Sequence, residues 1–303
     1  MDMEIGTEVW RGGVNCWECD EMGHMNTRFY LARSIQGMAV LFALAGLPGA
    51  IASHRPAAVR LTEMHIRFHR EAPAATALHM TGGFVALGED DAEILLLLHH
   101  SHGGTLAATF RLKLRHVNAA GETAAWPAEL RARAAAMMVE VPAEAQARSV
   151  STGQPTTAAP DLAAHKRIAI GALELADCDA TQLMLPQKFI GAVSDGIRQI
   201  TTPLRKIIVD HADPAPERFG GAVLEFRIVY LEWPRVGDCF EVRSAFRGAD
   251  KRTMAIEHWM VDAVSGRPFG HMESIAIVLD LDRRKVVGIT EPAQEALRPL
   301  VLA

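Results

Sequence analysis

The chain has 303 residues, of which 49% are hydrophobic and 22% charged, and its formal net charge is −5. This composition is typical of a folded globular protein, and the length is sufficient for two domains. The acidic balance argues against a nucleic-acid-binding protein, which needs a basic face. The longest strongly apolar run, 94–98, is too short to span a bilayer. The beginning of the chain shows no secretory leader, and four cysteines give no disulfide framework, so we expect a cytoplasmic protein.

The first part of the chain predicts one long helix followed by antiparallel strands. A strand is expected over 9–19 and a helix from about Asn26 to the Pro48-Gly49 stop signal. Five apolar residues of that helix recur at intervals of three or four and form one stripe, namely Leu31, Ile35, Met38, Phe42 and Ala45. Period-two alternation around 64–68 predicts the next strand, and further strands are expected over 77–87, 92–101 and 105–116. A central helix followed by a run of strands indicates an α+β fold.

A less regular segment follows and separates two similar halves. Residues 118–164 are rich in Ala, Pro, Ser and Thr, and only 128–138 could form a short helix there. The second half then predicts a strand over 168–178, a helix with Pro186 at its first position, alternation over 224–230, and strands over 239–246, 253–262 and 269–280. We therefore predict two domains, 1–120 and 165–303, joined by a connection over 121–164.

The two halves are copies of one strand–loop–helix unit. Cys19-Asp20 and Cys178-Asp179 lie 159 positions apart (178 − 19), and the helical aromatics Tyr30 and Phe189 have the same separation (189 − 30). The alternating strands that follow are shifted by 162, as Ile66 and Ile228 illustrate (228 − 66). The pattern indicates a duplicated domain.

Only the first copy keeps a polar loop. It reads Asp20-Glu21-Met22-Gly23-His24-Met25-Asn26, whereas Gln182, Leu183 and Leu185 replace the glycine, histidine and asparagine in the second copy. This asymmetry favours one active half, with the second half lining or closing an apolar pocket.

The loop and its helix resemble a known family. Asp20, Gly23, His24, Asn26 and Tyr30 match the pattern of hotdog-fold acyl-CoA thioesterases of the 4-hydroxybenzoyl-CoA thioesterase group. The spacing of Asp, His and Asn is also similar to that of plant and bacterial acyl-carrier-protein thioesterases. The resemblance implies two tandem hotdog domains, each a long buried helix wrapped by an antiparallel sheet. It also implies that they are joined as an internal pseudo-dimer with the reaction site at the seam.

The resemblance also implies roles for individual residues. Asp20 would supply the carboxylate, either as a nucleophile or as a general base that activates water. The backbone N–H seven residues later, at Thr27, would stabilise the oxyanion at the start of the helix. Asp179 has Pro186 at the corresponding place, and proline has no N–H to donate. One competent site per chain follows.

Structural roles compete with these assignments. An aspartate before a helix often forms a turn or a cap, and Asn26 could be the N-cap alone. His24 could bind substrate or hold the loop through a hydrogen bond, and Tyr30 more often packs in the core. Gly23, Met25 and Arg28 are candidate substrate contacts, the arginine through the phosphates of coenzyme A. Asp195 aligns with Gln36 (195 − 36 = 159) and could face the first loop, although a polar turn of helix is the plainer interpretation.

No metal or cofactor is predicted. Cys16 and Cys19 form a solitary pair, for which reduced thiols are the default expectation. His99, His100 and His102 could suggest a metal site, but neighbouring residues on a strand point to opposite faces, so a solvated strand end is the preferred interpretation. No Gly-rich phosphate loop for a nucleoside triphosphate or NAD is evident in the sequence.

The sequence therefore predicts an acyl-CoA thioesterase, with an acyl carrier protein as the less favoured substrate carrier. A hotdog hydratase or dehydratase acting on 2-enoyl or 3-hydroxyacyl thioesters is one alternative. A non-catalytic acyl-CoA-binding protein is another. Further pairing into a homo-oligomer is compatible with the fold.

Overall fold

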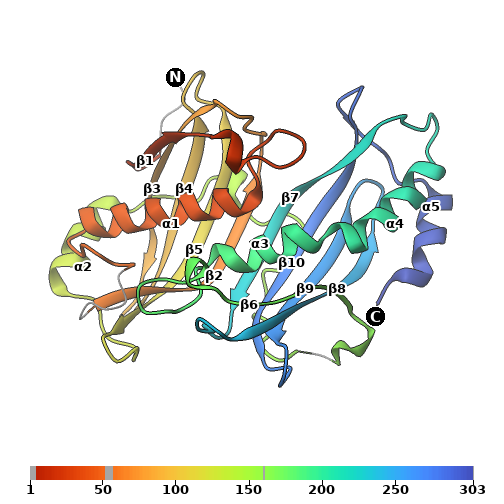
Figure 1. Ribbon diagram of the computed structural model, residues 1–303. Coiled ribbons are helices and arrows are strands. Elements are labelled where there is room, and N and C mark those ends of the chain that lie inside the picture. Colours follow the sequence, from red (N-terminus) through yellow and green to blue (C-terminus); the bar gives the residue numbers. More distant parts are fainter. Residues whose placement is uncertain (1–4, 52–56, 160, 303) are drawn as a thin grey trace. The chain divides into compact units, whose positions relative to one another are not determined.

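The computed structural model describes residues 5–51, 57–159 and 161–302. The chain folds as two compact units, one formed by Met1–Gln146 and Glu174–Ile190 and the other by Ala147–Leu173 and Gly191–Ala303. Each unit contains one antiparallel sheet, and helical segments lie along it (Figure 1).

In the first unit the sheet has the strand order β1-β3-β4-β5-β2. Its strands are β1 (Thr7–Gly13), β2 (Ala57–Phe68), β3 (Ala77–Leu87), β4 (Asp91–His100) and β5 (Leu106–Asn118). The helix α1 (Thr27–Leu44) packs against β1, β3 and β4. Apolar residues of both layers, such as Leu31, Phe42 and Met64, are fully buried and form the core between helix and sheet.

A glycine allows α1 to approach its sheet closely. A Cβ atom at Gly37 would lie 2.7 Å from Sδ of Met80 and 3.3 Å from Val9 Cγ2. The helix ends at Leu44, and Gly46 follows with a positive φ of 96°, which suits a glycine after a helix end.

In the second unit the strand order is β7-β10-β9-β8-β6, with β11 (Lys285–Val286) paired to β10. The strands are β6 (Lys166–Ala172), β7 (Phe219–Tyr230), β8 (Cys239–Ala249), β9 (Met254–Asp262) and β10 (Pro268–Asp280). The helix α5 (Glu291–Leu297) follows and packs against α4 (Arg198–Asp210).

The two sheets repeat each other residue by residue. β6 begins 159 residues after β1 (166 − 7), and β7, β8 and β10 begin 162 residues after β2, β3 and β5 (219 − 57, 239 − 77 and 268 − 106). Irregularities in the ladders also correspond, because the shift at Phe84/Ala86 recurs at Phe246/Gly248. The predicted α+β fold with repeated hotdog-like units is therefore confirmed.

The second helix differs from the single long helix that the sequence predicts. It is divided at Ile197 into α3 (Gln187–Gly196) and α4. Pro203 lacks the N–H that would bond the Gln199 carbonyl, and Lys166 Nζ donates to that oxygen instead at 2.7 Å. A Cβ at Gly196, which corresponds to Gly37, would lie 2.2 Å from the Ile168 carbonyl oxygen.

The strands predicted over 9–19 and 168–178 are shorter than expected. They end at Gly13 and Ala172, and each is followed by a 3₁₀ turn, η1 (Cys16–Glu18) or η5 (Leu175–Asp177). An acidic side chain closes each turn by accepting a backbone N–H, from Asn15 to Glu18 and from Glu174 to Asp177. These capping boxes favour a turn over continued pairing.

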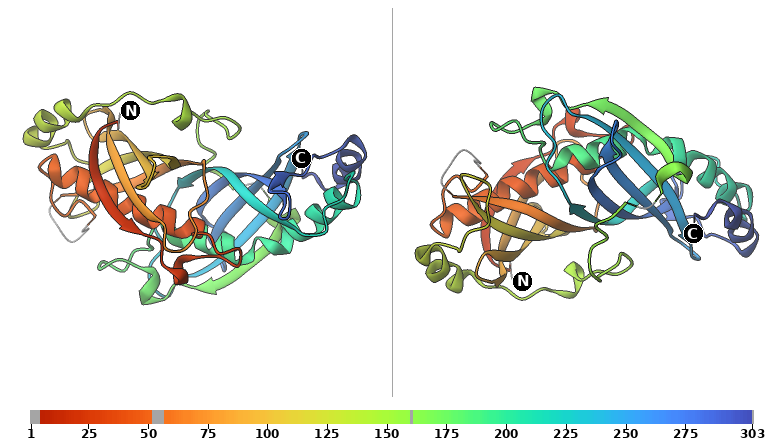
Figure 2. Two further views of the ribbon diagram at one scale, coloured as in Figure 1. Left: turned by 90° about the horizontal axis from the view of Figure 1, so that it is seen from above. Right: turned by 90° about the horizontal axis from the view of Figure 1, so that it is seen from below.

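The connection between the sheets includes short helical elements. They are α2 (Ala128–Ala134), η2 (Ala135–Met137), η3 (Ala143–Ala145) and η4 (Leu162–Ala164). The segment 137–146, yellow-green in Figure 2, covers the face of the first sheet opposite α1. There the Val139 N–H donates to the Phe84 carbonyl at 2.8 Å, and Ala145 packs on Leu95 and Leu97.

Membrane-spanning helices were sought among the described residues. None of the helices there is both long and apolar enough to cross a bilayer.

Candidate functional site

The first loop is a closed hairpin between η1 and α1. Cys19 and Met25 form an isolated antiparallel bridge at its base. Inside it, the Asp20 N–H donates to the His24 carbonyl at 2.8 Å and the Gly23 N–H donates to the Asp20 carbonyl at 3.0 Å. Gly23 has a φ of +79°, a conformation that glycine adopts without strain.

The Asp20 carboxylate is oriented by the loop backbone. Its Oδ1 accepts the Met22 N–H at 2.8 Å and the His24 N–H at 3.3 Å, while the side chain is half-buried. In the part of the chain that the structure describes, Oδ2 accepts no hydrogen bond. One oxygen therefore holds the carboxylate in place.

The start of α1 lies seven residues after Asp20. Asn26 is its N-cap, because Oδ1 accepts the Arg28 N–H at 3.0 Å and the Asn26 carbonyl accepts the Phe29 N–H at 2.9 Å. The Thr27 N–H has no acceptor among residues 5–51, 57–159 and 161–302. The Arg28 guanidinium carbon lies 5.7 Å from the centre of the Phe29 ring.

A buried acidic residue holds turn, loop and helix together. Glu18 accepts the Asn15 N–H at 2.8 Å with its carboxylate and forms an ion pair with Arg33 of α1. Its carbonyl accepts the Asn26 N–H at 2.8 Å. The position of Asp20 relative to the helix start is therefore determined by several bonds rather than by one.

The loop also docks against the segment after β2. The Met25 N–H donates to the Ala72 carbonyl at 2.8 Å, and the Met25 side chain is buried. His24 Nε2 lies 3.4 Å from Glu71 Oε2, and both side chains are only partly exposed. Sequence reasoning missed this contact of Glu71, because nothing in the spacing links the end of β2 to a loop 47 residues earlier (71 − 24).

Tyr30 belongs to the packing beneath the loop. Its ring meets Phe68 edge to face, with centroids 5.2 Å apart. Burial raises the pKa of the phenol, although a hydrogen bond with the Ala72 backbone opposes this effect. A buried neutral phenol is suited to packing, as the sequence predicts.

The second loop has the same backbone structure. The Asp179 N–H donates to the Leu183 carbonyl at 2.8 Å, and Asp179 Oδ1 accepts the N–H groups of Thr181 at 2.7 Å and Leu183 at 3.1 Å. Gln182 takes the place of Gly23 with a φ of +66°. The turn-forming role of the aspartate is therefore common to both loops.

The two loops differ in the groups that they present. Pro186 takes the place of Thr27 immediately before α3, and Leu183 and Leu185 take the places of His24 and Asn26. The Leu185 carbonyl still accepts the Lys188 N–H at 2.9 Å, so the helix begins in the same way. Only the first loop combines an oriented carboxylate with a free N–H at the helix start.

Asp195 is the remaining candidate from the sequence. It is on α3 with an exposed side chain, and its counterpart Gln36 on α1 is exposed as well. Gln36 accepts the Trp10 Nε1–H at 2.9 Å, so its side chain contacts β1. The role of Asp195 at the first loop stays a prediction.

The second sheet contains buried polar side chains at positions that are apolar in the first. Ser274 Oγ donates to the Ile256 carbonyl at 3.1 Å, so it accepts the His258 Nε2–H at 2.9 Å, and Ser244 Oγ donates to His258 Nδ1 at 2.7 Å. His258 is fully buried, and this burial lowers the pKa of the imidazole to about 3.

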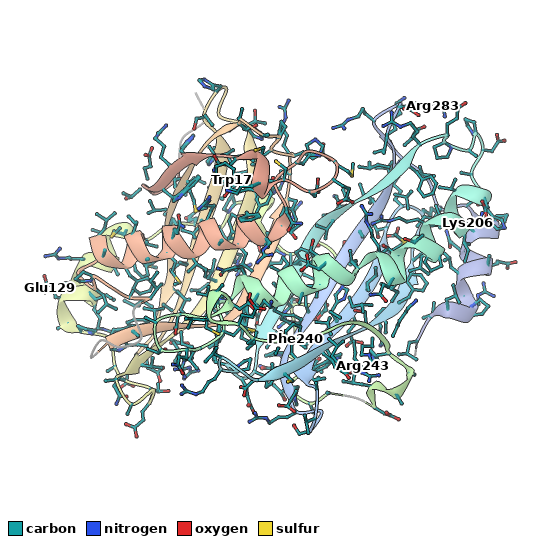
Figure 3. The ribbon with its side chains drawn as sticks, viewed as in Figure 1. Trp17, Glu129, Lys206, Phe240, Arg243 and Arg283 are labelled. Atoms are coloured by element: carbon teal, nitrogen blue, oxygen red, sulfur yellow. The ribbon has the colours of Figure 1, made fainter. Side chains whose placement is uncertain are left out.

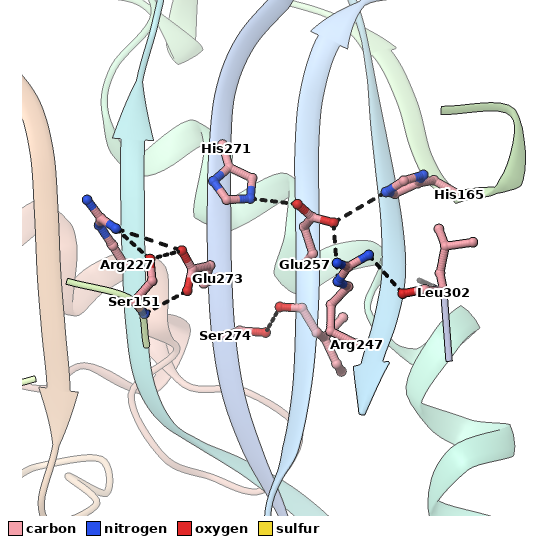
Figure 4. Close-up of polar contacts among 10 residues, drawn as sticks. Ser151, His165, Arg227, Arg247, Glu257, His271, Glu273, Ser274 and Leu302 are labelled. Atoms are coloured by element: carbon pink, nitrogen blue, oxygen red, sulfur yellow. Dashed lines mark hydrogen bonds and ion pairs between the residues drawn. The ribbon is translucent and has the colours of Figure 1, made fainter. Parts of the chain in front are cut away.

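A neighbouring cluster centres on Glu257 (Figure 4). Its carboxylate lies 2.9 Å from His271 Nε2, 3.4 Å from His165 Nε2 and 3.8 Å from Arg247 Nε. Burial alone would raise its pKa, but the contact with His271, the positive charge of Arg247 and the His165 hydrogen bond hold the pKa at about 2. In the described residues, no group of three or more His, Cys, Asp or Glu side chains is arranged to hold a metal ion.

Comparisons with known proteins agree with this arrangement. The family model of the thioesterase-like superfamily matches residues 14–134, which contain the first loop, α1 and β2 to β5. A search of curated proteins finds no match.

Three solved structures share the fold over most of the chain. A protein assigned as an oleoyl thioesterase from Lactobacillus plantarum has a TM-score of 0.68 at 9% identity, covering 89% of this chain and 96% of that chain. An acyl-ACP thioesterase from Bacteroides thetaiotaomicron has a TM-score of 0.63 at 9% identity, with coverages of 88% and 96%. The 12:0-ACP thioesterase from Umbellularia californica has a TM-score of 0.66 at 11% identity, with coverages of 88% and 95%.

At such identities the structural likeness establishes the fold alone. The thioesterase-like family model covers the first repeat, residues 14–134, and together with the shared fold it supports an enzyme of the thioesterase type.

Proposed function

We propose that this protein hydrolyses an acyl thioester to a free acid and a thiol, using the first loop alone. The observation that carries the proposal is the geometry of Asp20. Its Oδ1 is held by two backbone N–H groups, while Oδ2 is unoccupied within the described residues. A helix whose first N–H is also free begins seven residues later, at Thr27.

The chemistry follows from these two groups. Asp20 Oδ2 either attacks the thioester carbonyl carbon or removes a proton from the water that attacks it. In both cases the carbonyl oxygen becomes negative, and the Thr27 N–H together with the positive end of α1 stabilises it. Collapse of the intermediate breaks the carbon–sulfur bond and releases the thiolate. In the nucleophilic route, water then hydrolyses the mixed anhydride and restores Asp20.

His24 and Glu71 complete the proposed site. The ion-pair contact at 3.4 Å holds the imidazole beside the loop that carries Asp20. His24 can then donate a hydrogen bond to the substrate from its other ring nitrogen. Asn26 supports the site indirectly, because it caps the helix whose first N–H is the oxyanion donor.

The second loop lacks the complete set. Asp179 has the same orienting bonds as Asp20, but Pro186 cannot donate, and Leu183 replaces the histidine. We propose that this loop has a structural role and contacts the acyl group through its apolar side chains.

The acyl group can be carried by coenzyme A or by an acyl carrier protein. The resemblance of the loop favours acyl-CoA, with Arg28 as a contact for its phosphates, as the sequence predicts. Two of the three similar structures are described as ACP thioesterases, and this supports the acyl carrier protein as the alternative.

The test is thiol release from matched substrates that carry the same acyl chains on coenzyme A and on an acyl carrier protein. We expect turnover with one carrier at a kcat/KM at least about tenfold above the other, and a large loss in Asp20→Ala. Hydrolysis that persists unchanged in that variant would remove Asp20 from the mechanism. Hydration of an enoyl-CoA with an intact thioester would instead favour the hydratase alternative.

A further inference from the structure

The turn before Asp20 carries two cysteines whose spacing matches its geometry. The Cys19 N–H donates to the Cys16 carbonyl at 3.2 Å, which makes the four residues one 3₁₀ turn. Residues three apart on a 3₁₀ helix are eclipsed and are separated by about 6 Å along its axis. Cα atoms joined by a disulfide are usually about 4.4–6.8 Å apart, so this turn can accept the bond with little backbone movement.

Both thiols are free, and they differ in accessibility. Cys16 is exposed, whereas Cys19 is half-buried and its Sγ donates to the Asn15 carbonyl at 3.5 Å. Burial raises the pKa of the Cys19 thiol, and the neighbouring Asp20 carboxylate adds to this effect. Trp17 lies between the two and is 74% exposed, so the turn projects into solvent, where a small reagent can reach it (Figure 3).

We propose that Cys16 and Cys19 form a reversible disulfide, a modification site in the turn that precedes the catalytic loop. The oxidant is a low-molecular-weight disulfide, such as the disulfide of the thiol that thioester hydrolysis releases. The exposed Cys16 thiolate attacks one sulfur of that disulfide and expels a thiolate. Cys19 then attacks the Cys16 sulfur and expels the second thiolate. Two cysteine thiols and one disulfide thus become one protein disulfide and two free thiols, and the two cysteine protons end on the released thiols.

The bond acts on the site through its neighbours. Cys19 is bonded in sequence to Asp20 and bridges to Met25 at the base of the loop. Forming the disulfide removes the hydrogen bond from Cys19 Sγ to the Asn15 carbonyl and draws the Cys19 side chain toward Cys16. A displacement of about 1 Å between carboxylate and oxyanion donor is enough to cost about 10²-fold in rate. This effect on activity rests on the proposed function, whereas formation of the disulfide does not.

The experiment uses the full reduced chain, incubated with oxidised glutathione or with coenzyme A disulfide and then alkylated. The tryptic peptide 12–28 contains both cysteines, whereas Cys178 and Cys239 lie in separate peptides. We expect peptide 12–28 to lose two hydrogen atoms and resist alkylation, and to recover on reduction. Thioesterase activity falls about tenfold or more in parallel. Cys16→Ser and Cys19→Ser abolish the modification, and activity then becomes insensitive to the oxidant.

The second repeat provides a matched control. Its turn has the same bond, from the Cys178 N–H to the Leu175 carbonyl at 3.2 Å, but leucine stands where Cys16 stands in the first. In a chain with Cys16→Ser and Leu175→Cys, we expect a disulfide within the tryptic peptide 168–188 and unchanged activity.

Two outcomes would overturn the proposal. One is a peptide 12–28 that stays alkylatable or stops at the mixed disulfide while the Leu175→Cys control chain closes its bond. The other is disulfide formation that leaves the activity of a working enzyme unchanged. A chain that forms the disulfide but hydrolyses no thioester would instead refute the proposed function.

Discussion

The two loops of this protein have the same backbone and different chemistry. Both close with an aspartate whose Oδ1 accepts two loop N–H groups, at 2.8 and 3.3 Å for Asp20 and at 2.7 and 3.1 Å for Asp179. Both place a residue with positive φ after the aspartate, Gly23 or Gln182. The aspartate is thus required by the fold in both repeats, and its presence alone does not identify a catalytic site.

The difference lies at the helix start and beside the loop. Thr27 presents an N–H where Pro186 has none, and His24 contacts Glu71 where the second loop has Leu183. A catalytic carboxylate is distinguished by the donor and the partner placed around it. The comparison therefore gives each proposed role a matched position at which the same substitution should have no effect.

A large effect on the rate is expected when the first helix start is given the proline of the second. Thr27→Pro removes the proposed oxyanion N–H, while proline is well tolerated at the first position of a helix. We expect kcat to fall by about 10²–10³-fold with little change in Tm. The reciprocal Pro186→Thr should leave kcat unchanged. A Thr27→Pro variant that is folded and fully active would exclude this N–H as the donor.

A second prediction concerns the pH dependence of stability, which should arise from buried polar residues that only the second sheet contains at these positions. Ser244, His258 and Ser274 stand where the first sheet has Gly82, Leu96 and Leu112. The pKa of His258 lies at about 3 in the fold, below its ordinary value of 6.5, so only the unfolded chain binds a proton between these values. Stability is therefore fully present above pH 6.5 and is lost as the pH falls.

The loss from this group amounts to at most about 1.4 kcal/mol per pH unit. Glu257, with a pKa held at about 2 instead of 4.5, adds a loss in the same direction below pH 4.5. Urea unfolding between pH 6.5 and 4.5 excludes Glu257 but still includes His69 and His100, whose pKa values burial also lowers, so His258 is identified by comparison with a variant. The triple variant Ser244→Gly, His258→Leu, Ser274→Leu copies the first sheet and should show a shallower slope. An equally steep slope in that variant would assign it to other groups.

The smallest effect on stability is expected at His24 and Glu71. Both side chains are partly exposed, so their contact should contribute about 0.2–1 kcal/mol. Glu71→Gln should therefore change the free energy of unfolding little, yet lower kcat/KM by misorienting His24. Glu71→Asp should recover part of the activity. A double-mutant cycle with His24→Gln tests the coupling, and strictly additive losses in kcat/KM would contradict it.

The sequence predicted the fold well because the repeat is regular. Alternation around Met64 and Ile228 marks strands whose inner faces are buried, and the offsets of 159 and 162 identify the paired elements. The strands predicted over 9–19 and 168–178 extend further than the observed ones. Capping by Glu18 and Asp177 forms a turn there and competes with strand pairing. The sequence also missed the break at Ile197 between α3 and α4, and Pro203 lies inside α4.

The site was only partly predictable. Asp20, His24 and the helix start lie within one short motif, so their proximity follows from sequence. The N-cap role of Asn26 follows from the same local rule and is confirmed. Glu71 meets His24 only because the segment after β2 runs beside the loop, as the Met25 bond to Ala72 shows. Such a contact depends on tertiary structure and leaves no signal in spacing.

The most direct test compares Asp20→Asn with Asp179→Asn in thiol release from the preferred acyl thioester. Asparagine keeps an oxygen that can accept the two loop N–H groups in either repeat, so both variants should fold with similar Tm. We expect Asp20→Asn to lower kcat by about 10²–10⁴-fold and Asp179→Asn to leave it within about twofold. Equal losses in the two variants, or an active Asp20→Asn, would contradict the account.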